Sequence, residues 1–148
     1  MLDLSSLDKS LKTLEEALWA GEASPTDKFI RDACIRRFEY SYDLSHKTLR
    51  RFLALSEPAP AAVAELGFAG LIRLGYVRGL IPGEWRQWRR YRDARNLTSH
   101  AYDEAKAVAI LEVIGDFYRE ADELPRPLQV IVTPARSILT LPCAVSTI

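Results

Sequence analysis

The chain has 148 residues, enough for one domain with a buried core, and its 20 basic and 20 acidic residues leave no net charge to attract nucleic acid or a membrane surface. It lacks a run of 18 apolar residues and the pattern of a secretory leader, which argues against a membrane-spanning or secreted protein. Cys34 and Cys143 form neither a disulfide framework nor a metal-ligand spacing, so the reducing cytoplasm is the expected location.

The first half of the chain predicts two helices. Leucines recur every three or four residues over about residues 4–20, which gives one helix an apolar stripe. A second helix is predicted over about residues 26–54, with Ser24 or Thr26 as its cap and Pro25 near its first turn. We expect its buried side to consist of Phe29, Ala33, Phe38, Tyr42, Leu49 and either Phe52 or Leu53.

Three further helices are predicted in the second half. Pro58 and Pro60 end the long helix, and a short helix is expected over about residues 60–74. A fourth helix is predicted over about residues 83–98, and a fifth over about residues 101–123. The apolar anchors of these two helices are Ile81, Trp85, Trp88 and Tyr91, and then Val108, Leu111, Ile114, Phe117 and Tyr118. No segment before residue 125 alternates as a strand does, so the predicted fold is all-α: an antiparallel up-and-down bundle of four main helices plus a short helix.

A change in composition divides the chain near its end. Residues 124–148 contain four prolines and no acidic residue, and their apolar residues lack helical spacing. We therefore predict a helical-bundle domain at residues 1–123 and an irregular C-terminal tail at residues 124–148.

Arginines are concentrated in one segment of this otherwise neutral chain. Residues 86–95 hold five arginines and one aspartate. An amphipathic helix would leave Arg86, Arg89 and Arg90 solvated, whereas a functional surface would use them to bind a phosphate backbone. The segment leads directly into "RNLTSHAY", so a phosphate drawn to it would arrive beside His100.

The spacing of Arg95 and His100 predicts a break in the fourth helix. On an unbroken helix, five residues turn the chain by roughly 500°, so the two side chains would point about 140° apart. They can face one cleft only if the helix ends near Thr98 and Ser99, where polar side chains compete with the helix backbone.

An arginine and a histidine that share a cleft suit RNA cleavage without a metal. Histidine titrates near neutrality and can take a proton from a 2′-hydroxyl or give one to the leaving oxygen. Arginine can hold the scissile phosphate through two parallel hydrogen bonds and stabilise the charge that develops there. The residues alone thus make Arg95 and His100 candidate catalytic groups, with no metal and no cofactor expected.

Two segments carry a resemblance to a known family. "RDACIRRFEYSYDLSHKTLRRFL" (residues 31–53) and "DARNLTSHAYDE" (residues 93–104) resemble the two signatures of the bacterial nucleotidyltransferase substrate-binding family, part of the HEPN superfamily. That family overlaps the HepT-like toxins, whose motif R-x4-H-x-Y is matched here by Arg95, His100 and Tyr102. The resemblance spans roughly residues 4–122.

The resemblance implies a HEPN-like bundle that forms a homodimer, with motifs from both protomers lining one RNA-binding cleft. It implies catalysis by Arg95 and His100, and we expect the neighbouring Arg92 and Asn96 to bind substrate. It further implies a partner, an MntA-like nucleotidyltransferase that transfers AMP to Tyr102 and so inactivates the protein. We expect Tyr102 at the start of the fifth helix, where the positive helix end favours an anion.

Some positions depart from the family pattern or leave alternatives open. The family often has threonine at the position of Ala101, where it would form a capping box with Glu104, and alanine cannot form this cap. We expect His46, where the family commonly has a large aromatic, to pack against the bundle. Glu39 and Asp43 either form ion pairs along the second helix or orient an arginine near the motif, and the sequence does not decide between these.

Three functions remain open from the sequence. The one we favour is a ribonuclease toxin of a type VII toxin–antitoxin pair, because all three motif positions are intact. The alternatives are a non-catalytic subunit that binds a substrate or nucleotide for a nucleotidyltransferase, and a structural interaction domain with an idle motif. We expect Trp85 and Trp88 to lie in the core or the dimer interface rather than to stack on bases.

Overall fold

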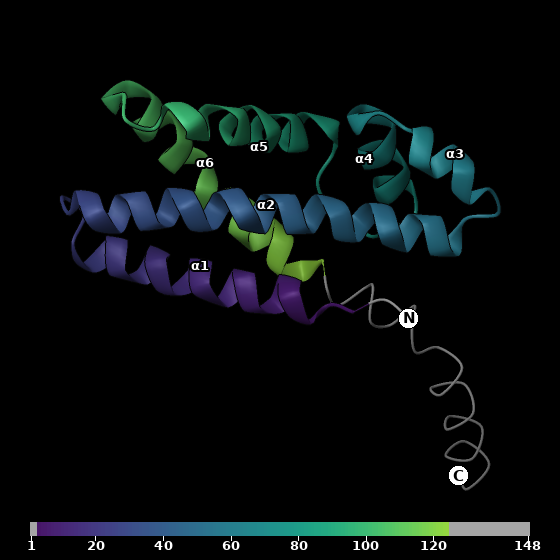
Figure 1. Ribbon diagram of the computed structural model, residues 1–148, viewed down its shortest axis with the longest axis horizontal. Coiled ribbons are helices and arrows are strands. Elements are labelled where there is room, and N and C mark those ends of the chain that lie inside the picture. Colours follow the sequence, from purple (N-terminus) through teal and green to yellow (C-terminus); the bar gives the residue numbers. More distant parts are fainter. Residues whose placement is uncertain (1–2, 125–148) are drawn as a thin grey trace, which may run out of the picture.

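The chain folds into a bundle of helices (Figure 1), seen in a computed structural model that describes residues 3–124. The elements are α1 (Ser5–Ala23), α2 (Lys28–Ser56), α3 (Pro60–Glu65), α4 (Phe68–Val77), α5 (Trp85–Leu97), the 3₁₀ turn η1 (Thr98–His100) and α6 (Glu104–Glu123). Since residues 3–124 contain no strand, the all-α prediction is confirmed. The predicted tail, from Pro125 onward, lies outside the described residues.

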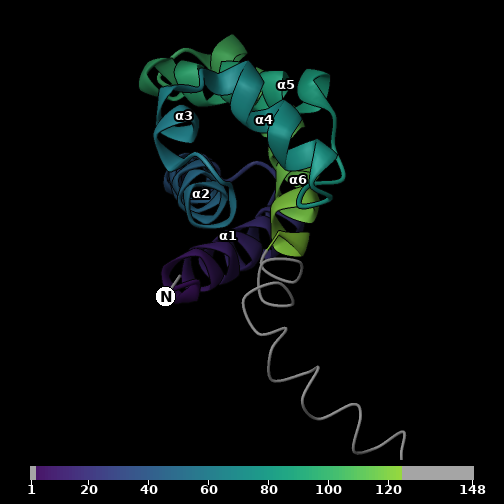
Figure 2. The ribbon, with the colours of Figure 1, turned by 90° about the vertical axis from the view of Figure 1, so that its right-hand side faces the viewer.

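The long helix α2 lies at the centre of the bundle. It runs antiparallel to α1, and α6 packs against both of these helices. The helices α3, α4 and α5 lie along the side of α2 opposite α1 (Figures 1 and 2). The core between α2, α5 and α6 is aromatic: Phe38 meets Phe117 edge to face at 5.1 Å between ring centroids, and Trp88 is 1% exposed. Trp88 is therefore a core residue.

The start of α2 differs from the prediction. Neither Ser24 nor Thr26 is the cap, because the side chain of Asp27 accepts hydrogen bonds from the backbone N–H groups of Phe29 (2.9 Å) and Ile30 (3.2 Å). Phe29 was expected on the buried side but is 88% exposed. The nine residues from Phe29 to Phe38 turn the helix by roughly 900°, which places the two side chains on opposite faces.

The short helix predicted over residues 60–74 is in fact two helices, α3 and α4. The chain turns at Leu66, which has an extended backbone with φ −63° and ψ 132°. Arg50 of α2 stabilises this corner, since its Nη1 donates to the carbonyl oxygens of Val63 (3.0 Å) and Leu66 (3.1 Å). The turn brings Phe68 of α4 over α2, next to His46.

A buried carboxylate fixes the orientation of α5 on α6. Glu120 of α6 is 9% exposed and accepts hydrogen bonds from Trp88 Nε1 (2.9 Å) and the Tyr91 hydroxyl (2.7 Å). Burial and the bond to Glu120 raise the pKa of Tyr91. A Cβ at Gly83 would lie 1.8 Å from Glu120, so the loop before α5 needs glycine there. With Trp88 and Tyr91 held inward, Arg86, Arg89, Arg90 and Arg92 of α5 are exposed.

Candidate functional site

The fourth predicted helix ends where the motif requires a break. Helix α5 stops at Leu97, and η1 continues the chain as a single 3₁₀ turn that ends at His100. Thr98 uses its hydroxyl twice, donating to the carbonyl oxygen of Arg95 (2.7 Å) and accepting from Arg95 Nη1 (3.1 Å). A polar side chain thus competes with the helix backbone at the predicted position.

The carboxylate of Asp43, from α2, holds the guanidinium group of Arg95. Nε and Nη2 of Arg95 donate to the two carboxylate oxygens of Asp43, at 2.9 and 3.1 Å, and Glu39 lies 3.8 Å from Nη2. The hydrogen bond to Asp43 raises the pKa of Arg95 above its ordinary value. Of the two alternatives, Asp43 follows the one in which a carboxylate of α2 orients a motif arginine, whereas Glu39 forms an ion pair along α2 with Arg36 at 2.9 Å.

The ion pair with Asp43 limits the N–H donors that Arg95 can direct at a phosphate. The two parallel hydrogen bonds expected for a phosphate are made with Asp43 instead. Together with the bond to Thr98, they use three of the five N–H donors of the guanidinium group. A phosphate therefore meets the outer N–H groups of an arginine whose position is already fixed.

Three of the predicted site residues line one hollow of about 370 Å³, which we call the α2–α5 hollow. Its lining residues are Tyr42, Asp43, His46 and Arg50 from α2, Phe68 from α4, and Arg92, Arg95 and Asn96 from α5. The guanidinium carbon of Arg92 lies 5.0 Å from the centre of the Phe68 ring, a cation–π contact. The predicted substrate-binding residues Arg92 and Asn96 thus adjoin Arg95.

His46 has the packing role that was expected. Its ring stacks between those of Tyr42 and Phe68, with centroid distances of 6.3 and 5.8 Å. Burial lowers the pKa of His46, and the nearby Arg50 guanidinium adds to this effect. Nothing in the sequence indicates that this ring borders a hollow, because the second stacking partner, Phe68, comes from another helix.

His100 and Tyr102 lie beyond the end of α5, on an exposed turn. Their rings meet edge to face at 6.1 Å between centroids, and Tyr102 is 86% exposed. Tyr102 borders a separate hollow of about 350 Å³ beside Glu39 and Thr98. Arg95 lines the α2–α5 hollow, and His100 is not among the residues that line it in the described part of the chain.

The predicted start of the last helix near residue 101 is wrong by three residues. Helix α6 begins at Glu104, and the side chain of Asp103 caps it by accepting from the backbone N–H of Lys106 at 3.2 Å. Asp103 therefore supplies the cap that Ala101 forgoes. Tyr102 precedes the helix instead of opening it, and the carboxylate of Asp103 already lies at the positive helix end, while Glu104 in the first turn pairs with Arg31.

The arginines of α5 differ in their partners. Arg90 lies 3.6 Å from Asp116, whereas Arg86, Arg89 and Arg92 have no carboxylate partner among the described residues. Arg89, Arg92 and Asn96 are three and four residues apart, so they share one side of α5. A row of unpaired positive charge therefore leads along α5 toward the turn that holds His100.

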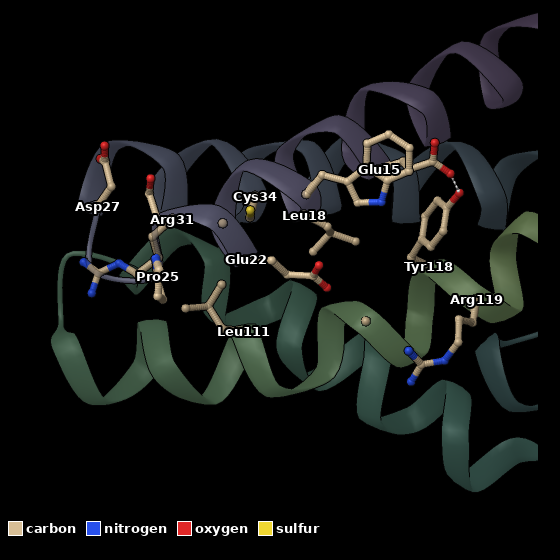
Figure 3. A pocket seen from close by; sticks show the side chains of 14 residues that line it. Glu15, Leu18, Glu22, Pro25, Asp27, Arg31, Cys34, Leu111, Tyr118 and Arg119 are labelled. Atoms are coloured by element: carbon tan, nitrogen blue, oxygen red, sulfur yellow. Dashed lines mark hydrogen bonds between the residues drawn. The ribbon is translucent and has the colours of Figure 1, made fainter.

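A further hollow of about 560 Å³ lies between α1, the start of α2 and α6 (Figure 3). Acidic Glu15 and Glu22 line it together with apolar Leu18 and Leu111, and Tyr118 donates a hydrogen bond to Glu15. No residue of the R-x4-H-x-Y motif is among those lining it in the described part of the chain. This hollow is thus separate from the motif.

The described residues suggest neither a metal site nor a membrane span. Within residues 3–124, no three His, Cys, Asp or Glu side chains are grouped so that they could hold a metal ion. Over the same range, no helix is both long enough and apolar enough to cross a membrane.

Comparisons with known proteins agree on one family. Residues 2–130 match the family model described as "Nucleotidyltransferase substrate binding protein like". The chain is 32% identical, over 136 residues, to a Haemophilus influenzae protein named "Probable ribonuclease HepT", covering 86% of this chain and 92% of that protein.

Two solved structures resemble this one. HI0074 from Haemophilus influenzae, described as having the fold of a substrate-binding domain of a nucleotidyltransferase, matches with a TM-score of 0.80 and 31% identity over 86% of this chain and 99% of its own. A Thermus thermophilus protein matches with a TM-score of 0.67 and 32% identity, over 82% of this chain and 98% of its own.

Proposed function

The chain belongs to the HepT-like family of nucleotidyltransferase substrate-binding proteins, and on this premise we propose that it is a metal-independent endoribonuclease in which Arg95 and His100 are the catalytic residues. One observation carries the proposal: the helix break at Thr98 presents an intact R-x4-H-x-Y motif at the end of a row of unpaired arginines. The relative named a probable ribonuclease supports it.

In the proposed mechanism, the RNA backbone lies along the exposed side of α5, where Arg89, Arg92 and Asn96 contact phosphates. The 2′-hydroxyl attacks the adjacent phosphorus, so the P–O2′ bond forms and the P–O5′ bond breaks. His100 takes the 2′-hydroxyl proton or donates one to the leaving 5′-oxygen, and solvent water supplies or accepts the other proton. Arg95, held by Asp43, stabilises the negative charge on the phosphate through its outer N–H groups.

The proposed active unit is a homodimer. One chain leaves Arg95 in the α2–α5 hollow and His100 on the exposed turn beyond it. We propose that its two-fold axis passes close to this turn, so that the turns of the two protomers lie together and build one cleft from both motifs.

We propose that the protein is the toxin of a toxin–antitoxin pair and that an MntA-like nucleotidyltransferase adds AMP to Tyr102. The exposed hydroxyl of Tyr102 is accessible to a transferase, and the ring adjoins that of His100. An attached nucleotide would add negative charge and bulk beside the proposed proton-transfer group.

A second candidate function is a non-catalytic subunit that binds a nucleotide for its nucleotidyltransferase partner. The description of HI0074 as a substrate-binding domain favours it. This alternative gives no reason for His100 to matter, whereas the ribonuclease proposal requires it.

The test of the proposed function is cleavage of RNA by the purified protein in the presence of a chelator. We expect cleavage to continue with excess EDTA, and we expect light scattering to give the mass of a dimer at micromolar concentration. Loss of cleavage on chelation, restored by a divalent cation, would show that the enzyme needs a metal. A monomer with full activity would rule out the shared cleft.

Asp43→Asn should separate binding of RNA from its cleavage. Removing a negative charge beside the phosphate should lower KM, while a less firmly held Arg95 should lower kcat by about tenfold, a loss of roughly 1.4 kcal/mol of transition-state stabilisation. Steady-state kinetics on a short RNA measures both constants. The variant should stay folded, since ion pairs with this degree of exposure contribute at most about 1 kcal/mol.

Asp93→Asn is the matched control for Asp43→Asn. It makes the same change of charge at an exposed position of α5, and Asp93 forms no ion pair or side-chain hydrogen bond among the described residues. If both variants change kcat equally, the loss reflects net charge, and Asp43 does not position Arg95.

A further inference from the structure

The α2–α5 hollow has features beyond what binding of a phosphate by α5 requires. Its volume of about 370 Å³ falls in the range of roughly 300–1,000 Å³ typical of small-molecule sites. Half of its lining comes from α2 and another part from α4, so the hollow extends inward from the exposed Arg92 and Asn96 of α5. A backbone phosphate on the outer side of α5 would leave this inner part of the hollow unfilled.

The charges in the hollow favour an anionic ligand. Three guanidinium groups line it, from Arg50, Arg92 and Arg95, against the single carboxylate of Asp43. Arg50 is tied to the backbone carbonyls of Val63 and Leu66, and Arg95 is tied to Asp43. Arg92 has no carboxylate partner among the described residues, so its charge is available to a ligand.

The wall formed by α2 and α4 is suited to a nucleobase. The rings of Tyr42, His46 and Phe68 stack in a row, with angles of 15° and 22° between successive planes. The guanidinium group of Arg92 lies over the Phe68 ring, and planar arginine groups stack on splayed-out RNA bases. Because burial lowers the pKa of His46, its imidazole is neutral near pH 7 and offers one donor and one acceptor to a base edge.

The hollow also adjoins the motif, since Arg95 lines it. We propose that the α2–α5 hollow binds the base of the nucleotide next to the cleaved phosphate, and that His46 is a specificity-determining residue that selects this base. The inference rests on the proposed ribonuclease function for its place in the reaction. It adds a nucleotide-binding site and a base preference that the motif alone does not provide.

The test is the base preference of cleavage in wild type and in His46→Phe. Phenylalanine keeps an aromatic ring between Tyr42 and Phe68 but removes both ring nitrogens. On short RNAs that differ only in the nucleotide flanking the cleaved bond, wild type should prefer one base by at least about tenfold in kcat/KM. His46→Phe should reduce this preference to less than about threefold. An unchanged preference in the variant, or none in wild type, overturns the inference while the ribonuclease function stands.

Arg92→Gln provides a second variant at an exposed position that the fold does not depend on. It should raise KM by about tenfold for all four bases, because it removes stacking and charge but no base-edge contact. Arg51→Gln is the control, since Arg51 is another exposed arginine, on α2 and outside the hollow. Equal effects of the two variants would mean that only general positive charge matters, which overturns the proposed site.

A binding measurement keeps this inference distinct from the catalytic proposal. Titration calorimetry with adenosine, guanosine, cytidine and uridine 5′-monophosphates should show one preferred nucleotide, and His46→Phe should lose that preference. If wild type cleaves no RNA but binds a nucleotide in this His46-dependent way, the site stands and the ribonuclease function fails. If none of the four binds and cleavage shows no base preference, the inference is wrong.

Discussion

His100→Ala is expected to lower the rate of RNA cleavage by at least about a hundredfold, which is the usual contribution of a general acid or base. The imidazole lies on an exposed 3₁₀ turn, with its ring against Tyr102 as its aromatic contact. Its removal should therefore lower the rate of RNA cleavage and leave the stability of the fold nearly unchanged. The measurement is the initial rate on a labelled RNA, in EDTA, with the melting temperature as a check of folding.

Arg95→Ala should cause a loss of similar size, for a different reason. It removes the group that stabilises charge on the phosphate, and it leaves Asp43 without its cation, whereas Glu39 keeps its ion pair with Arg36. The control for both variants is Ser99→Ala, an exposed neighbour within the same turn, which should cleave at the wild-type rate. Wild-type activity in His100→Ala would assign the cleavage to another residue or to a contaminating nuclease.

The helix break at the motif could be predicted because it follows from local rules. The angle between Arg95 and His100 on a regular helix and the polar residues between them both pointed to an end near Thr98. The aromatic core was also predictable in part, since Phe38, Tyr42, Trp88 and Phe117 repeat at helical spacing and are buried.

Features that depend on contacts between distant segments could not be predicted. The sequence placed Glu39 and Asp43 on one helix face but could not show that Arg95, 52 residues after Asp43, would meet them. The α2–α5 hollow depends on the turn at Leu66, which splits one predicted helix into α3 and α4 and brings Phe68 over α2. Apolar spacing alone does not reveal such a turn within a short helix.

Modification of Tyr102 is the second large effect that we expect, and it concerns control of the enzyme. Co-expression with the cognate MntA-like nucleotidyltransferase should lower cleavage by wild type at least about tenfold, while Tyr102→Phe should cleave RNA alone and resist its partner. Mass spectrometry should find AMP only on the peptide that contains Tyr102. The start of α6 matters here, because the Asp103 carboxylate already caps this helix end.

We therefore expect inhibition to come from charge and bulk beside His100, and not from binding of the added phosphate at the helix end. Tyr76→Phe is the matched control, since Tyr76 is another exposed tyrosine, 45% accessible and on α4. That variant should be modified and inactivated as wild type is. If the partner inactivates Tyr102→Phe as well, it acts by binding alone, and a modified Tyr102 that still permits cleavage would show that the motif tolerates a nucleotide beside His100.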